Sequence, residues 1–87
     1  MNYTVTWRPL AEDTLANLWM NAPDRNAVAR AADEIDALLA DDPLTQGESR
    51  KDNVRVMFVP PLGVLYEVSE PDRMVTVLKA WEIRPPD

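Results

Sequence analysis

Residues 54–84 read VRVMFVPPLGVLYEVSEPDRMVTVLKAWEIR, and this stretch decides the fold. Three runs are rich in apolar side chains, which alternate in part with other residues, and two turn sequences separate the runs: Pro60-Pro61-Leu62-Gly63 and Glu70-Pro71-Asp72-Arg73. Alternation with a period of two is typical of a strand with one buried face, and Pro, Gly and Asp are favoured in tight turns. The stretch therefore predicts three consecutive strands, over residues 54–59, 64–69 and 74–83.

A further strand and a helix are predicted at the start of the chain. Tyr3, Val5 and Trp7 alternate with polar residues, which indicates a strand over residues 3–7. Pro9 suits the first position of a helix, because the N–H that proline lacks would have no partner there. Apolar residues then recur at helical spacing until Pro23, where we expect this first helix to have ended.

A second helix is predicted between Asp24, a good N-cap, and Asp42, which precedes the helix-stopping Pro43. The residues of its apolar stripe are Val28, Ala31, Ala32, Ile35, Leu38 and Leu39. The short link to the first helix predicts a helical hairpin. Residues 45–53 are polar and are expected to form a loop.

This order of elements, β-α-α-β-β-β, predicts one α+β domain over residues 1–87. We expect two layers, with a mostly antiparallel four-stranded sheet and the two-helix hairpin on one of its faces. One core is expected to contain Val5, Val28, Ile35, Leu38, Leu39, Val56 and Val77.

The composition excludes several classes of function. The chain has no cysteine and no histidine, which excludes Ser-His-Asp and Cys-His triads and nearly all zinc sites. The acids at 33, 34, 36, 41 and 42 do not converge on one helix face, so no metal site is predicted, and no cofactor either. The net charge of −6 is unfavourable for binding nucleic acid through overall charge, because the phosphates are also negative. No apolar stretch could span a membrane and no signal peptide is evident, so we expect a cytoplasmic protein.

Four segments in this order resemble the RelE/ParE family of toxins from bacterial type II toxin–antitoxin systems, which includes plasmid-stabilisation proteins. They are Tyr3-Thr4-Val5-Thr6-Trp7, residues 35–43 followed by Gly47, Val64-Leu65-Tyr66-Glu67-Val68, and residues 75–81. The resemblance covers nearly the whole chain. It implies that the first strand lies beside the last, and that a small antitoxin protein binds and neutralises the chain. It also allows ribosome-bound mRNA as a target and a homodimer as the assembly.

For the ribonuclease branch, the resemblance implies attack by a 2′-OH of mRNA on the adjacent phosphate, inside the ribosome. This reaction needs a base, an acid and cations around the phosphate. The residues implied are Glu48 as base, with Arg50, Arg55, Lys79 and Arg84 around the phosphate. The chain departs from the family pattern in three places: Gly63 stands where an arginine is usual, Glu82 or Ile83 where His or Arg is usual, and the aromatic residue of the tail is absent.

Two alternatives to an active ribonuclease stay open. One is a catalytically degenerate toxin fold that serves as a protein-binding domain, and the other is an inhibitor of gyrase. The site residues also have ordinary structural interpretations. The charged segment 48–51 can be a solvated loop, Arg55 can pair with Glu67 on a strand, and Tyr66, Trp7 and Trp81 can be packing residues.

Overall fold

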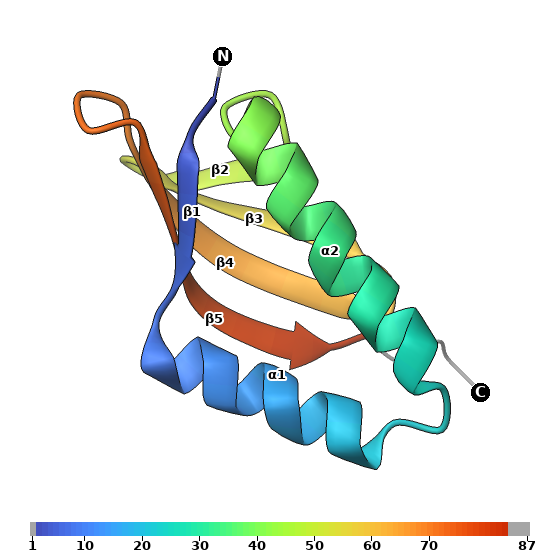
Figure 1. Cartoon of the computed structure of the whole chain (residues 1–87). Coiled ribbons are helices and arrows are strands. Elements are labelled where there is room, and N and C mark those ends of the chain that lie inside the picture. The colour runs from blue at the N-terminus through green and yellow to red at the C-terminus, as the bar shows by residue number, and fades with distance from the viewer. Residues whose placement is uncertain (1, 84–87) are drawn as a thin grey trace.

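The computed structural model describes residues 2–83 and has one five-stranded sheet and two helices (Figure 1). The elements are β1 (Thr4–Trp7), α1 (Pro9–Asn21), α2 (Arg25–Asp41), β2 (Glu48–Lys51), β3 (Val54–Val59), β4 (Leu62–Ser69) and β5 (Met74–Glu82). The strand order is β1-β5-β4-β3-β2. Only β1 and β5 pair in parallel, and the other neighbours are antiparallel. The predicted α+β class and the pairing of the first strand with the last are confirmed.

The sheet has five strands rather than the expected four. The segment that we expected to be a loop contains β2, which pairs antiparallel with β3. Asp52 closes this hairpin with a φ of 52°, in the left-handed region that Asp tolerates. All four residues of β2 are exposed, so the strand has no buried face and shows no apolar alternation. The next turn is also tighter than expected, because β4 already begins at Leu62.

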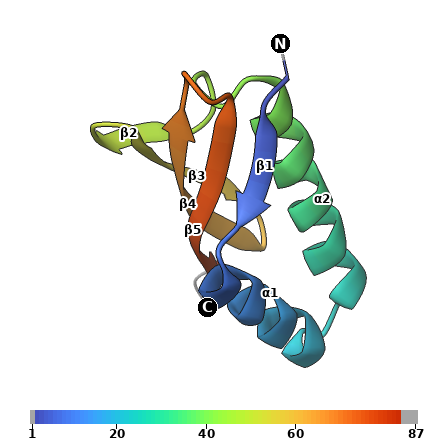
Figure 2. The same ribbon diagram turned by 60° about the vertical axis from the view of Figure 1, so that its left-hand side comes forward.

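The two helices meet at residues 22–24 and diverge from there (Figure 1). Pro9 occupies the start of α1, and the Asp24 carboxylate accepts a hydrogen bond of 3.1 Å from the Ala27 backbone N–H at the start of α2. Helix α2 covers one face of the sheet, whereas α1 packs against β5 (Figure 2). The predicted hairpin is therefore present, with its two arms splayed apart. No helix within residues 2–83 is long and apolar enough to cross a membrane.

The core lies between α2 and the sheet. The residues of the predicted core that are buried there are Val28, Ile35, Leu39 and Val77, while Val5 and Leu38 are half-buried against it. Val56 is buried, as expected, with 7% of its surface exposed, but its place is a correction because it lies outside this core cluster. The register pairs Val56 with Leu65 and Met57 with Val64, so Met57 joins the cluster and Val56 faces the other way. Because β3 has apolar residues in both phases, its sequence does not show which phase turns inward.

Candidate functional site

Arg55, one of the predicted site residues, lies on the helix-covered face and holds the segment before β2. Its Nε donates a hydrogen bond of 3.0 Å to the Gln46 carbonyl, and its Nη2 donates one of 3.3 Å to the Gly47 carbonyl. The register places Glu67 opposite Val54 and Arg55 opposite Tyr66. Pairing of Arg55 with Glu67 is therefore a wrong expectation, because the two side chains leave opposite faces of the sheet.

Tyr66 completes the attachment of this segment. Its hydroxyl lies 2.8 Å from the Pro43 carbonyl and 2.8 Å from the Gln46 carbonyl, so its single proton is shared between two acceptors. Burial raises the pKa of Tyr66, and the neighbouring Arg55 opposes part of this rise. The side chain is fully buried, which confirms its interpretation as a core residue.

Two rows of paired residues cross the sheet on the side turned away from α2, which we call the open face. The first row is Glu48, Val56, Leu65 and Lys79, one residue from each of four adjacent strands. Three strand spacings separate its charged ends by about 14 Å. Arg50 extends the Glu48 end through an ion pair of 3.6 Å between its Nη1 and the Glu48 Oε2. The row therefore has charged ends and an apolar centre, in which Leu65 is half-buried and Val56 is buried.

The second row of the open face is Phe58, Gly63 and Trp81. The two rings meet edge to face across the glycine, with centroids 6.2 Å apart and planes at 76°. A β-carbon on Gly63 would lie 2.6 Å from the Trp81 ring, so only glycine leaves room for the indole here. Trp81 thus packs on the sheet, as one of its interpretations predicted, while Phe58 is 54% exposed.

A groove of about 310 Å³ continues the open face past its β5 side. Leu10 and Thr14 of α1 line this groove together with Lys79 and Trp81 of β5. Leu10 is 74% exposed, the largest exposure among the large apolar side chains of the described residues. The sequence places Leu10 at helical spacing with other apolar residues, so nothing in its pattern distinguishes it from a core residue.

The structure brings only part of the predicted catalytic set together. Glu48 and Arg50 form a pair at one end of the open face, and Lys79 lies about three strands away. Arg55 belongs to the opposite face, and Arg84 lies outside the described residues. Within residues 2–83, these side chains are too far apart to contact a single phosphate group together. Their catalytic roles stay a prediction.

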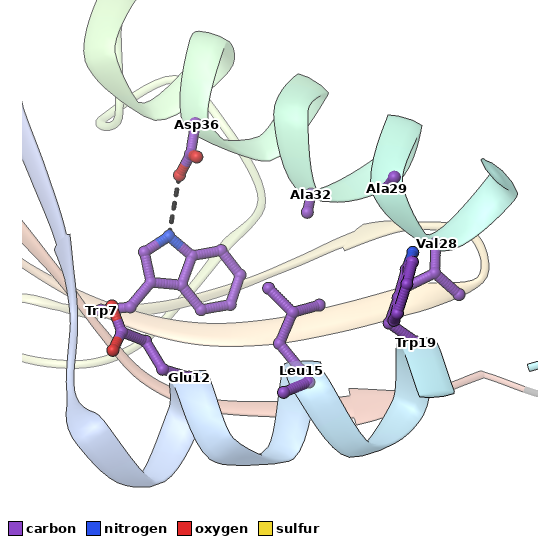
Figure 3. A pocket seen from close by; sticks show the side chains of 9 residues that line it. Trp7, Glu12, Leu15, Trp19, Val28, Ala29, Ala32 and Asp36 are labelled. Carbon is purple, nitrogen blue, oxygen red and sulfur yellow. Dashed lines mark hydrogen bonds between the residues drawn. The ribbon is translucent and has the colours of Figure 1, made fainter. Parts of the chain in front are cut away.

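A second groove, of about 390 Å³, separates the diverging helices (Figure 3). The residues that line it are Trp7, Glu12, Leu15, Ala16, Trp19, Val28, Ala29, Ala32 and Asp36. The Trp7 indole Nε1 donates a hydrogen bond of 2.8 Å to the Asp36 Oδ1. The sequence pattern indicates a packing role for Trp7 at the sheet and does not predict this groove. No cluster of acids within residues 2–83 is arranged to hold a metal ion.

No protein-family model matches the chain, and no curated protein matches it in sequence. Solved structures do match it in fold. The RelBE2 toxin–antitoxin complex of Mycobacterium tuberculosis contains a chain with a TM-score of 0.78 and 18% identity, covering 94% of this chain and 92% of that one. A chain of the RelE-RelB complex of Pyrococcus horikoshii has a TM-score of 0.71 and 19% identity, and the match covers 94% of this chain and 96% of that one. A chain of the chromosomal ParDE system of Pseudomonas aeruginosa has a TM-score of 0.69 and 13% identity, and the match covers 94% of this chain and 97% of that one.

These matches extend over nearly the full length of both chains in each pair. The chain therefore has the fold of the RelE/ParE toxins, as the resemblance in sequence predicted. Because the identities are below 20%, the likeness concerns the fold alone.

Proposed function

We propose that this chain is the toxin-like component of a type II toxin–antitoxin module, and that a small antitoxin binds it over the open face. Solved structures with the same fold come from toxin–antitoxin complexes, which supports this class of partner. The observation that carries the proposal is the row from Glu48 to Lys79, whose apolar centre and charged ends fit an amphipathic peptide.

Two features favour protein binding over RNA cleavage at this face. Gly63, at the place where the resemblance implies an arginine, lies under the Trp81 ring, so a longer side chain there has no room beside the indole. Arg55 is engaged by two backbone carbonyls on the other face of the sheet. Both observations support the catalytically degenerate alternative, in which the toxin fold acts as a binding domain.

Ribonuclease activity is the second candidate, and one observation favours it. Glu48, Arg50 and Lys79 all belong to the open face, where a bound RNA strand would find a carboxylate and two cations. In that case the three groups would act on neighbouring nucleotides, with Glu48 as base and the cations against the phosphates.

Growth on expression separates the two candidates. We expect a bacterium that strongly expresses the soluble chain without an antitoxin to grow normally. Growth arrest that Lys79→Ala relieves would instead support the ribonuclease and contradict the degenerate alternative. Arg30→Ala serves as the matched control, because Arg30 is an exposed cation of α2.

Binding itself is tested with the product of an adjacent reading frame that encodes a small helical protein. We expect the two proteins to co-purify, and we expect Lys79→Glu to weaken the complex while Arg30→Glu, with the same charge change, leaves it intact. Equal weakening by both variants would mean that net charge alone draws the partner, and the proposed face would then be wrong.

A further inference from the structure

The groove between the helices has an apolar floor and an acidic rim. Leu15 and Val28 lie on facing walls, and the two indoles of Trp7 and Trp19 lie toward opposite ends (Figure 3). On α2, the groove is lined by Ala29 and Ala32, whose short side chains leave the space between the two helices open. Trp19 is 42% exposed, so a large part of its aromatic surface is in contact with water. Exposed apolar surface of this kind is typical of interaction sites.

Glu12 and Asp36 supply the charges of the rim, near the Trp7 end of the groove (Figure 3). Asp36 is oriented by its hydrogen bond from the Trp7 indole, and Glu12 forms no ion pair with any of residues 2–83. The surrounding helices add to this negative field. Residues 9–41 contain seven acids, Glu12, Asp13, Asp24, Asp33, Glu34, Asp36 and Asp41, against two bases, Arg25 and Arg30.

A cation of the chain itself already stacks at the other end. The Arg25 guanidinium carbon lies 4.7 Å from the centroid of the Trp19 ring, and its Nη2 donates a hydrogen bond of 3.1 Å to the Met20 carbonyl. This contact is a cation–π interaction at an exposed residue. One end of the groove is therefore bounded by an indole that already stacks with an internal cation, and the other end has two carboxylates that form no ion pair with a cation of residues 2–83.

We propose that this groove docks a basic amphipathic segment of a protein partner. Apolar side chains of the segment would lie on Leu15 and Ala32, and a lysine or arginine would lie between Glu12 and Asp36. Charge complementarity selects this occupant: the acidic rim repels anionic lipid headgroups, nucleic acid and an acidic helix of a second copy. This surface is separate from the open face, which fits a peptide with the opposite charge preference near Lys79 and Arg50. The inference therefore goes beyond the antitoxin contact proposed above.

The probe is a 15-residue designed helical peptide with leucines along one face and lysines along the other, and the matched control peptide has glutamates in place of the lysines. Each is titrated into the isotopically labelled full chain. We expect the lysine peptide to shift the indole N–H signals of Trp7 and Trp19 and the amides of Leu15 and Ala32. The glutamate peptide should leave these signals in place.

Two substitutions, Glu12→Gln and Glu34→Gln, distinguish binding in the groove from general attraction to the acidic helices. Glu12→Gln should raise the dissociation constant about two- to fivefold, the range measured for exposed ion pairs. Glu34→Gln removes the same charge from a residue of α2 outside the groove, and we expect a change below about twofold. Ala29→Leu, at an exposed residue of the groove wall, fills the groove and should weaken binding without a loss of folded protein.

Equal effects of Glu12→Gln and Glu34→Gln would overturn the proposal, because they would show attraction to bulk charge. Shifts confined to residues 54–83, no shifts at all, or self-association of the chain through the two indoles would overturn it as well. These outcomes all concern the designed lysine peptide. Antitoxin binding over the open face is measured with a different protein, the product of the adjacent reading frame, and it succeeds or fails separately.

Discussion

The indole ring of Trp81 lies directly over Gly63, so close that a β-carbon on residue 63 would come within 2.6 Å of the ring atoms Cε2 and Nε1. The two residues are cross-strand partners on β4 and β5. A glycine beneath an aromatic ring on a neighbouring strand is a known device for stabilising a sheet. The resemblance implies an arginine at position 63, but in this chain the Trp81 ring occupies the space that its side chain would need. An arginine at position 63 and the Trp81 ring in its present place therefore exclude each other.

Gly63→Ala tests this relationship. The added methyl group forces the indole to move, and we expect the free energy of unfolding to fall by about 1–3 kcal/mol, as for other overpacked sites. The measurement is a urea titration. Trp81→Ala should remove most of the penalty, so that the double variant is more stable than the sum of the two single changes predicts. Additive effects would show that the ring and residue 63 do not compete for space.

Ile35→Ala tests the phase of α2. Ile35 is fully buried, and its truncation should lower the free energy of unfolding by about 2–4 kcal/mol through lost burial and a residual cavity. Leu10→Ala is the control, since Leu10 is 74% exposed and we expect a change within about 0.5 kcal/mol. A loss below about 0.5 kcal/mol for Ile35→Ala in a denaturant titration would mean that another face of α2 meets the sheet.

Arg55→Gln tests whether Arg55 holds the segment before β2. Losing its charge-assisted bonds to the Gln46 and Gly47 carbonyls should cost about 1.5–3 kcal/mol. Amide hydrogen exchange should become faster in residues 44–51. Lys79→Gln, on the open face, should leave this exchange unchanged. Equal exchange rates in the wild type and Arg55→Gln would contradict the anchoring role.

Tyr66→Phe tests the two carbonyl contacts and the titration of the phenol. Because burial raises the pKa of Tyr66 in the folded state, its contribution to stability is fully present below the unfolded pKa of about 10. It is lost as the pH rises through the higher folded value. The free energy of unfolding of the wild type should therefore fall more steeply above about pH 10 than that of Tyr66→Phe. At pH 7 the variant should be less stable by about 1 kcal/mol. Parallel pH profiles would contradict a buried, protonated phenol.

The sequence predicted most of the fold because α2, β4 and β5 each turn one apolar face to the core. The helical stripe through Ile35 and Leu39 and the alternation through Val75 and Val77 identify that face directly. It failed at β2, whose side chains are all exposed, and at the phase of β3. In β3 the charged Arg55 faces inward, where two backbone carbonyls accept its hydrogen bonds, and a pattern based on polarity cannot show such compensation.

The candidate site was harder to predict, because register decides which residues meet. Glu48 and Lys79 are 31 positions apart in the chain and belong to one row only because three strand pairings align them. The groove between the helices depends on their angle, which the apolar stripes do not fix. The sequence does contain one sign of the groove: the small residues Ala29 and Ala32, whose short side chains leave space next to α2.

Amide shift mapping with the adjacent-frame partner shows whether the open face is the partner-binding surface. The labelled chain is titrated with the unlabelled partner at two salt concentrations, since charged ends on the face make association depend on ionic strength. We predict that the shifts cluster at residues 56–58, 63–65 and 79–81. Shifts confined to residues 24–40, on the acidic helix α2, would contradict the account.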